Sequence, residues 1–415
     1  MRILLLTQWF DPEPTSKGLV FARTLADAGH EVEVLTGFPN YPGGDVYPGY
    51  RIRAWQRESI GGISVVRVPL FPSHDSSAAR RVLNYVSFAA AASVLGTLLV
   101  SKPDVVYVHH PPLTAGVAAV VLSRIRRAPF VYDVQDLWPD TLLATGMVRG
   151  RRLLWLVGWL CAWVYQRAAA VVVLSPGFSN ALIERGVPHE KVEVILNWCD
   201  ERRLVLENDP EVRASLRAGD RFNVVFAGTM GKAQGLESVL QAAELLAVSD
   251  PRVQFAFVGD GVEADGLAQL ASEKELKNVV FLPRMPMSAI GRVLDAADIL
   301  LVHLKDDPLF EITVPGKTQA YLSVGKPILM AVGGDAAAII SASNAGVTCR
   351  PADPEDLARA VTMLAAMRPD ELKAMGERGR EYYRTQMSLA VGAEKFLGVF
   401  ERVVSGPTRA SRWGL

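Results

Sequence analysis

A glycine-bearing loop in the second half of the sequence has the residue types that bind phosphate. Residues 223–246 read NVVFAGTMGKAQGLESVLQAAELL, an apolar run followed by Gly228, Gly231 and Lys232 and then an amphipathic stretch. A strand, a glycine turn and a helix N-terminus offer backbone N–H groups and a positive dipole end to an anion. The loop therefore suits a diphosphate, although any strand-to-helix turn can carry glycine. Its spacing departs from GxxxxGK[ST], which disfavours P-loop hydrolysis.

A second loop with similar chemistry lies within residues 306–334. Its polar and glycine positions are Glu311, Thr313, Gly316 and Lys317. Pro315 suits the first turn of the helical pattern that follows, which leaves the next backbone amides free to meet an anion. Two such loops in one half of the chain strengthen the prediction of a phosphate site. The alternative for this loop is a solvated lysine beside a helix start.

Carboxylates and an aromatic residue follow an apolar run in the first half, within residues 129–142, PFVYDVQDLWPDTL. These positions are Asp133, Gln135, Asp136, Trp138 and Asp140. Carboxylates and an amide bind hydroxyl groups, and an aromatic ring beside them can stack on a sugar or a base. The pattern fits sugar recognition, but Asp136 or Asp140 could instead cap the helix that follows.

The remaining residues with ligand chemistry give no metal site. His109 and His110 end another apolar run, and their spacing suggests no metal triad. The three cysteines lie far apart without a CxxC pair, which supports neither a zinc site nor a disulfide framework and favours a reducing cytoplasm. The 44 basic and 44 acidic residues cancel, so no overall field attracts nucleic acid.

These loops must be positioned by alternating strands and helices. The expected strands are residues 3–7, 31–36, 65–69, 105–108, 129–132 and 171–174 in the first half, and 223–226, 254–258, 279–282, 299–304 and 327–331 in the second. Strands that alternate with helical stretches predict parallel sheets joined by βαβ crossovers. A length of 415 residues allows two or three domains. We predict an α/β fold of two Rossmann-like, doubly wound domains facing across a cleft, with ligands at the carboxyl ends of the strands.

The domain boundary is expected where charge density rises after a strand, near Asp200. We predict a first domain over residues 1–199, a second over 200–388, and a final segment, 389–415, whose helix crosses back to the first domain.

Two stretches of the first half could contact a membrane. Residues 82–100 approach spanning length without a charge, and we expect a buried or surface-lying helix there rather than a span. Residues 149–170 combine Arg149, Arg151 and Arg152 with tryptophans at four-residue spacing, Trp155, Trp159 and Trp163. Arginines beside an aromatic stripe suit an anionic membrane surface, although the stripe could also pack on the core.

In their order along the chain, these motifs resemble the retaining glycosyltransferases of family 4, which have the two-domain GT-B fold. AGHEVEVLT, DLWPD, VILNWCD, AGTMGKAQGLE, VGDG and GKPIL carry the resemblance over roughly residues 1–400. TGFPNYP, DLWPD and GKAQGLE are similar to a branch of bacterial exopolysaccharide and O-antigen sugar transferases, such as fucosamine and colanic acid glycosyltransferases.

The resemblance implies transfer of a sugar from a nucleotide sugar, expected to be a UDP-sugar, to an acceptor hydroxyl, with retention and without a metal or other cofactor. It assigns the donor to the second domain and the acceptor to the first. The expected donor contacts are Gly228, Gly231, Gly259, Asp260, Arg284, Met285, Thr313 and Gly316. The expected catalytic residues are Lys232, Glu311, Lys317 and Asp136. The expected acceptor contacts are Lys17, Gly18, Tyr41, His109, Gln135 and Trp138.

Three departures from the family pattern affect the site. Thr229 and Gln234 replace basic residues that many members carry in the donor loop, and Gln135 stands where a histidine is frequent. At the second of two glutamates spaced eight apart stands Gln319, counted from Glu311, or Ala320, aligned on GKP. Phosphate-directed lysines and amides would neutralise the leaving group, and the departing phosphate could accept the acceptor's proton. No protein nucleophile is therefore predicted.

The expected role is sugar transfer to a polyprenyl-diphosphate-linked sugar during cell-surface polysaccharide or glycolipid assembly. The protein would be cytoplasmic, with a peripheral position at the inner face of the membrane left open. Three alternatives also stay open: a nucleotide-sugar 2-epimerase, a natural-product glycosyltransferase, and a catalytically degenerate donor-binding subunit.

Overall fold

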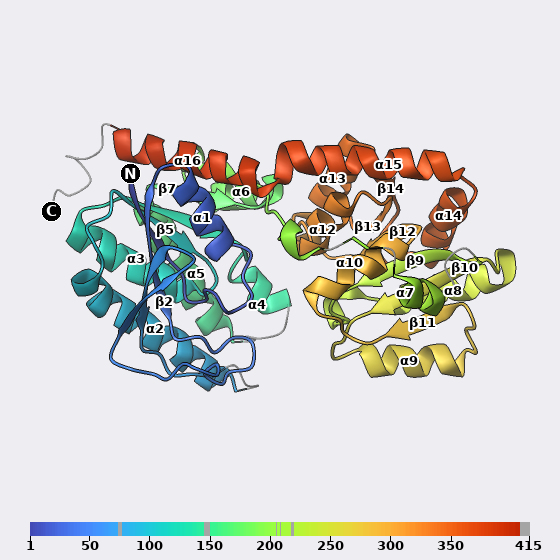
Figure 1. Cartoon of the computed structure of the whole chain (residues 1–415), viewed down its shortest axis with the longest axis horizontal. Helices are drawn as coiled ribbons and strands as arrows, with labels where there is room; N and C mark the ends of the chain where they lie inside the picture. The colour runs from blue at the N-terminus through green and yellow to red at the C-terminus, as the bar shows by residue number, and fades with distance from the viewer. Residues whose placement is uncertain (74–76, 145–149, 205, 208, 217–219, 407–415) are drawn as a thin grey trace. The chain divides into compact units, whose positions relative to one another are not determined.

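The computed structural model of this protein describes residues 1–73, 77–144, 150–204, 206–207, 209–216 and 220–406 (Figure 1). Its chain divides into two compact units. Unit 1 comprises Met1–Leu196 together with the chain from Gly392 onward, and unit 2 comprises Asn197–Val391. The first unit is therefore discontinuous in sequence, while the second is a single continuous segment.

Unit 1 is built on an eight-stranded sheet with the order β3-β4-β2-β1-β5-β6-β7-β8. All neighbouring strands are parallel except β3, which pairs antiparallel with β4. The strands are β1 (Arg2–Leu6), β2 (Glu31–Gly37), β3 (Gln56–Ile60), β4 (Ile63–Val68), β5 (Val105–His109), β6 (Phe130–Val134), β7 (Ala170–Val173) and β8 (Val192–Val194). The strand order reverses between β1 and β5, so ligands are expected near the carboxyl ends of these two strands.

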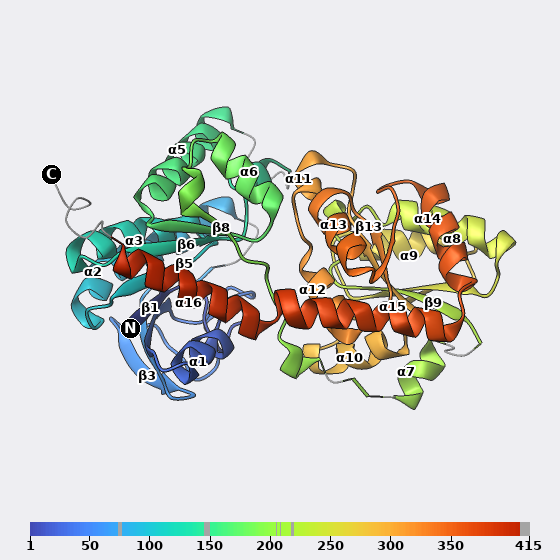
Figure 2. The same ribbon diagram turned by 90° about the horizontal axis from the view of Figure 1, so that it is seen from above.

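Helices cover this sheet, and the last of them returns from unit 2. They are α1 (Leu19–Asp27), α2 (Ala78–Leu99), α3 (Leu113–Arg126), α4 (Asp140–Ala144), α5 (Arg151–Arg167), α6 (Pro176–Glu184), the short 3-10 turn η1 (His189–Lys191) and α16 (Leu389–Ser405). Figure 2 shows α16 beside α1. Phe396 of α16 packs edge-on against Phe21 of α1 and Tyr107 of β5, at 5.4 Å between ring centroids in both pairs.

Unit 2 has a fully parallel six-stranded sheet with the order β11-β10-β9-β12-β13-β14. The strands are β9 (Phe222–Ala227), β10 (Val253–Val258), β11 (Val279–Leu282), β12 (Ile299–His303), β13 (Ile328–Ala331) and β14 (Gly346–Thr348). The helices are η2 (Glu201–Arg203), α7 (Pro210–Ser215), η3 (Lys232–Gln234), α8 (Glu237–Ser249), α9 (Ala264–Glu273), α10 (Met287–Ala296), α11 (Pro308–Glu311), α12 (Gly316–Val324), α13 (Gly334–Ser343), α14 (Pro354–Ala365), α15 (Pro369–Tyr382) and the π-helix η4 (Tyr383–Met387).

The predicted fold class of two doubly wound α/β domains is confirmed. Strands β10, β12 and β13 are buried along their whole length, as expected for parallel strands covered on both faces. Their continuous apolar runs are the reason that the sequence located them. The expected strands lack β3, β8 and β14, which all lie at a sheet edge, and β3 is half polar.

Candidate functional site

A cavity of about 760 Å³ opens in unit 2 at the carboxyl ends of β9 and β10. It is lined by Leu204, Ala227, Gly228, Thr229, Val258, Gly259, Asp260, Gly261, Arg284, Met285, Pro286, Ile290, Leu294, Gly316, Lys317, Ala320 and Tyr321. The polar part of this lining comes from loops and a helix start, and the apolar part comes largely from α10 and the segment before it. Such a division suits a ligand with one charged and one flat apolar half.

Glycines after β9 and β10 allow two loops to touch at the cavity. Gly259 and Gly261 have φ of 143° and 156°, a region that favours glycine. A Cβ on Gly259 would overlap the carbonyl oxygen of Gly228, and one on Gly261 would overlap that of Met230. Backbone bonds lock the contact, since the Met230 N–H donates to the Asp260 carbonyl at 2.9 Å. These glycines are required by backbone packing whatever the cavity binds.

The first loop is less open to an anion than its sequence suggests. The Gly228 N–H donates to the Val258 carbonyl at 2.8 Å, and the Gly231 N–H donates to the Gln234 side chain at 3.0 Å. Two of the amides expected to be free are therefore already engaged. Lys232 is exposed on η3 and does not line the cavity.

The second loop delivers a lysine into the cavity. Helix α12 begins at Gly316 with Pro315 as its N-cap, one position earlier than the predicted first turn. The Lys317 Nζ lies 3.3 Å from the centre of the Phe226 ring and close to Gly228. Among the described residues it has no hydrogen-bond partner. Burial lowers the pKa of Lys317 to about 7. A buried, unpartnered amine beside a helix N-terminus is arranged to meet an anion.

Seven of the predicted residues of unit 2 line this cavity: Gly228, Gly259, Asp260, Arg284, Met285, Gly316 and Lys317. Gly231, Lys232, Glu311 and Thr313 do not. The Thr313 hydroxyl donates to the Leu309 carbonyl within its own turn. The backbone of Glu311 packs on Gly334 at the start of α13, where a Cβ would overlap the Glu311 carbonyl oxygen.

Two supports of the cavity were not anticipated. Tyr321 is buried, and its hydroxyl accepts from the Ala227 N–H at 2.8 Å. His303, at the end of β12, donates from Nδ1 to the Gln234 carbonyl at 2.6 Å, and its Nε2 lies 3.0 Å from the Ser238 hydroxyl. Burial lowers the pKa of His303 to about 4, so the ring stays neutral while it holds the glycine loop. Both residues resemble ordinary core positions in the sequence.

In unit 1, a buried polar cluster surrounds Asp133 at the carboxyl ends of β5 and β6. Its carboxylate accepts from the Lys17 amine and the Tyr107 hydroxyl, both at 2.5 Å, and from the Gln135 amide at 2.6 Å. Burial raises the pKa of Asp133, but Lys17 and His109 outweigh it and hold the pKa well below its usual range. Burial also lowers the pKa of Lys17, which its ion pair opposes.

Two of the predicted acceptor contacts, Lys17 and His109, are buried in this cluster. Lys17 is 1% exposed and His109 is 8% exposed, so neither side chain is open to a ligand in this conformation. Gly18 serves the backbone, because a Cβ there would overlap the Asp11 carboxylate that receives the Leu19 N–H at the start of α1. Their acceptor-binding role stays a prediction, and the structure shows them as parts of a buried cluster and of the backbone turn before α1.

The other predicted residues of unit 1 are half-buried at the same sheet edge. Gln135 is held by Asp133, and Trp138 packs edge-on against His110 at 5.3 Å between ring centroids. Tyr41 stacks on Trp9 at 4.5 Å. Burial raises the pKa of Asp136. Among the residues with described positions, no group of three or more His, Cys, Asp or Glu is placed to hold a metal ion.

Two doubly wound α/β units, one of which has a glycine-loop cavity where Lys317 has no partner among the described residues, agree with the GT-B type of glycosyltransferase fold. The chain belongs to the glycosyltransferases: residues 19–198 match the family of the glycosyl transferase 4-like domain, and residues 208–382 match glycosyl transferases group 1. The predicted family and enzyme class are thereby confirmed.

Individual relatives agree with this assignment. The chain is 30% identical over 341 residues to a protein described as the colanic acid biosynthesis glycosyl transferase WcaI of Escherichia coli, a match that covers 78% of this chain and 82% of that one. It is 27% identical over 282 residues to a protein described as the glycosyltransferase WbjE of Pseudomonas aeruginosa, with 66% and 69% covered.

The similarity to solved structures bears on the fold and not on the activity. Alr3699/HepE of Anabaena in complex with UDP and glucose has a TM-score of 0.68 at 18% identity, with 96% of this chain and 99% of that one covered. The α,α-trehalose 6-phosphate synthase of Burkholderia multivorans has a TM-score of 0.74 at 15% identity, with 100% and 99% covered.

Proposed function

We propose that this glycosyltransferase moves a sugar from a UDP-sugar to an acceptor hydroxyl with retention at the anomeric carbon. The observation that carries the proposal is the Lys317 amine, which is buried and without a partner among the described residues at the cavity of unit 2. A diphosphate at the start of α12 would supply the missing anion. The nucleoside would lie on the apolar wall formed by Leu204, Ile290 and Leu294.

The expected chemistry is stabilisation of the leaving group. As the glycosidic bond to the diphosphate breaks, negative charge grows on the phosphate oxygen, and Lys317 with the first amides of α12 offsets that charge. The departing phosphate accepts the proton of the acceptor hydroxyl on the same face of the sugar. This route requires neither a protein nucleophile nor a metal. Glu311, at the end of α11, and Lys232, on η3, would contact the donor sugar and phosphate from beside the cavity.

The donor nucleotide and the biological role are inferred from relatives. HepE was crystallised with UDP and with UDP-glucose, and WcaI is described as acting in colanic acid biosynthesis. By analogy, we infer a UDP-sugar donor and a role in cell-surface polysaccharide or glycolipid assembly. The first domain would bind the acceptor, and Asp136 is our candidate to hold its reacting hydroxyl.

A polyprenyl-diphosphate-linked acceptor at the cytoplasmic membrane is the finer form of this proposal. Residues Ala79–Leu99 of α2 are long and apolar enough to span a membrane by length and composition, and 28% of their most apolar window is buried. Core helices of soluble proteins pass the same test, so this observation is weak by itself. On α5, Trp155 is 71% exposed and Trp159 is 53% exposed. The alternative that this stripe packs on the core is therefore wrong for these two rings.

The donor site can be tested by thermal stabilisation with UDP, GDP, dTDP, ADP and their sugars. A ligand at 100 times its Kd stabilises the folded state by about 2.7 kcal/mol. We expect a shift with UDP and UDP-sugars, and we expect Lys317→Met to weaken that binding by about 10- to 100-fold, since a charge-assisted contact contributes about 1.5–3 kcal/mol.

Lys373→Met, at an exposed position on α15, is the control and should retain the full shift. An unchanged affinity in Lys317→Met would reject the phosphate role. No shift of the unmodified protein with any nucleotide would favour a degenerate subunit instead.

A further inference from the structure

Three aromatic side chains from distant parts of the sequence meet in unit 1. Trp9 follows β1, Tyr41 follows β2, and Tyr85 lies on α2. The rings of Trp9 and Tyr41 stack at 4.5 Å between centroids, and Tyr85 meets Trp9 edge-on at 6.4 Å. All three are half-buried, so each retains solvent-accessible surface. They lie at the carboxyl edge of the sheet, where ligands bind in this fold class.

A chain of buried amides fixes the backbone immediately before each of these rings. Gln8, Asn40 and Asn84 directly precede Trp9, Tyr41 and Tyr85, and each amide residue is no more than 1% exposed. The Gln8 side chain donates to Asn84 at 2.5 Å, and the Asn84 side chain donates to Asn40 at 3.2 Å. Polar side chains that are buried and bonded to one another specify a single arrangement. The three rings are therefore held by a dedicated network.

Glu13 joins the loop that carries Trp9 to the loop that carries Tyr41. Its side chain is 2% exposed. One carboxylate oxygen accepts from the backbone N–H groups of Asn40 and Tyr41, both at 2.8 Å, and the other accepts from the Phe10 N–H at 3.1 Å. Burial raises the pKa of Glu13 to about 7, while these three donors oppose the rise. The Glu13 carboxylate thus joins two irregular loops that have no strand pairing between them.

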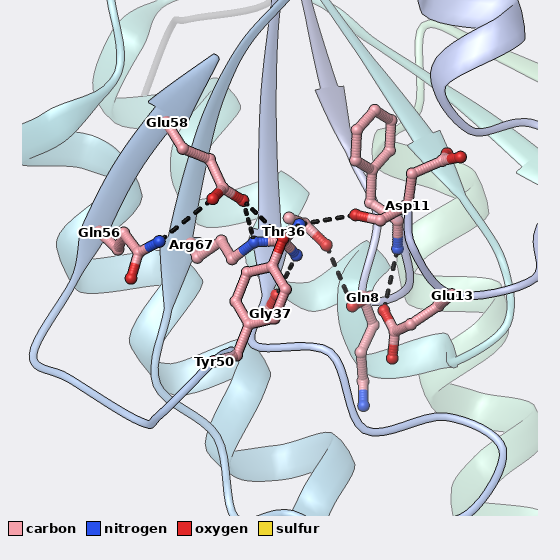
Figure 3. Close-up of polar contacts among 10 residues, drawn as sticks. Gln8, Asp11, Glu13, Thr36, Gly37, Tyr50, Gln56, Glu58 and Arg67 are labelled. Carbon is pink, nitrogen blue, oxygen red and sulfur yellow. Dashed lines mark hydrogen bonds and ion pairs between the residues drawn. The ribbon is translucent and has the colours of Figure 1, made fainter. Parts of the chain in front are cut away.

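Arg67 of β4 ties the same loops to the sheet, as Figure 3 shows together with Glu13. Its buried guanidinium donates to the Gly37 carbonyl at 3.0 Å and to the Asp11 carbonyl at 2.6 Å, and it pairs with Glu58 at 2.5 Å. The loops after β1 and β2 are thus fixed on two sides. Such rigid support is what a binding surface needs when its ligand must be held in one orientation.

We propose that Trp9, Tyr41 and Tyr85 form a stacking site for a sugar ring of the acceptor, and that Glu13 is the positioning residue that keeps the site assembled. The aromatic faces would cover the C–H face of the ring, while the Asp136 carboxylate, which follows β6 at the same sheet edge, would accept its hydroxyl hydrogens. The inference rests on the proposed glycosyl transfer and names the acceptor's class as a carbohydrate with an apolar ring face.

The test is saturation-transfer NMR of the full chain with methyl α- and β-glycosides of glucose, galactose, fucose and N-acetylglucosamine. We expect transfer strongest at the ring C–H protons of one face for at least one glycoside. Trp9→Leu should reduce it at least threefold, and Tyr85→Leu should do the same. Trp55→Leu, which changes a 48% exposed tryptophan elsewhere in unit 1, should leave it unchanged.

The role of Glu13 has its own readout. Glu13→Ala should reduce the saturation transfer as strongly as Trp9→Leu although both rings remain. Glu13→Gln should retain part of it, because an amide oxygen can still accept from Asn40 and Tyr41. If Glu13→Ala fails to fold, Glu13→Gln tests the positioning role. Saturation transfer as strong as in the wild-type protein would then overturn that role.

The stacking site is overturned if no methyl glycoside receives saturation from the wild-type protein, or if Trp9→Leu behaves like Trp55→Leu. Nucleotide binding in unit 2 is measured separately on the same variants. If a variant loses glycoside contact but UDP still raises its melting temperature, the proposed glycosyl transfer stands and only the stacking site is rejected. If no nucleotide raises the melting temperature of the wild-type protein, the proposed glycosyl transfer is rejected as well.

Discussion

Lys317 has a buried amine over an aromatic ring and, among the described residues, no anion or acceptor beside it. Burial alone is the cause that lowers its pKa to about 7 from an ordinary value of 10.5. At pH 8 most of the free protein therefore carries a neutral Lys317. An anion placed beside this nitrogen favours the charged form and raises the pKa again. Binding of a diphosphate should then be coupled to proton uptake.

We predict that UDP binding at pH 8 takes up close to one proton per site. Isothermal titration calorimetry in HEPES and in Tris, which have different ionisation enthalpies, measures this number directly. Lys317→Met should abolish the uptake, while Lys232→Met, which removes an exposed lysine, should retain it even if affinity falls. Identical binding enthalpies in the two buffers for the wild-type protein would contradict the assignment.

At the scale of elements, α16 supplies an apolar face to unit 1. Phe396, Val399 and Phe400 are buried, and Phe396 also lies under the Lys17 amine, at 4.9 Å from its ring centre. The segment from Gly392 onward thus completes the core around Phe21 and Tyr107. It also covers the buried ion pair between Lys17, in the segment that joins β1 to α1, and Asp133 of β6.

We predict that Phe396→Ala lowers the free energy of unfolding of unit 1 by about 3–5 kcal/mol, the usual cost of truncating a buried phenylalanine. Urea denaturation followed by fluorescence and circular dichroism measures the change. Lys395→Ala on the exposed side of the same helix should stay within about 0.5 kcal/mol of wild type. A loss below about 1 kcal/mol in Phe396→Ala would mean that α16 is dispensable for unit 1.

At the scale of the whole molecule, exposed apolar residues gather on the helices of unit 1. On α2, Val82, Val86, Val94 and Leu98 are each about half exposed or more, and they form two pairs at four-residue spacing. Helix α3 packs between α2 and α5, which carries the exposed Trp155 and Trp159. Arginines lie in the first turns of α2 and α5, at residues 80, 151 and 152. Together these features suit a peripheral contact with an anionic bilayer.

We predict that the protein sediments with vesicles rich in phosphatidylglycerol at low salt and is released as salt rises, because the arginine contribution is screened. The double variant Trp155→Ser and Trp159→Ser should bind roughly tenfold more weakly, since each ring loses burial in the interface. Trp55→Ser is the matched control and should sediment like wild type. A wild-type protein that stays in the supernatant under these conditions would remove the membrane proposal.

The sequence by itself determined the two-unit α/β fold, because its parallel strands are continuous apolar runs and hydrophobic pattern is a local property. It also located the loop of Lys317 and the glycines at 228 and 259, since helix starts and tight turns require particular residues nearby in sequence. Edge strand β3 was missed because its exposed side is polar and carries no apolar run.

Only the tertiary structure decided which of the predicted site residues already have an interaction partner within the protein. Lys17 and Asp133 are 116 positions apart in the chain, yet their pairing buries both, while Lys317 is buried beside no anion among the described residues. Trp9, Tyr41 and Tyr85 likewise become neighbours only when three elements pack together. Burial and pairing depend on distances between remote residues, and a local pattern of residue types does not contain those distances.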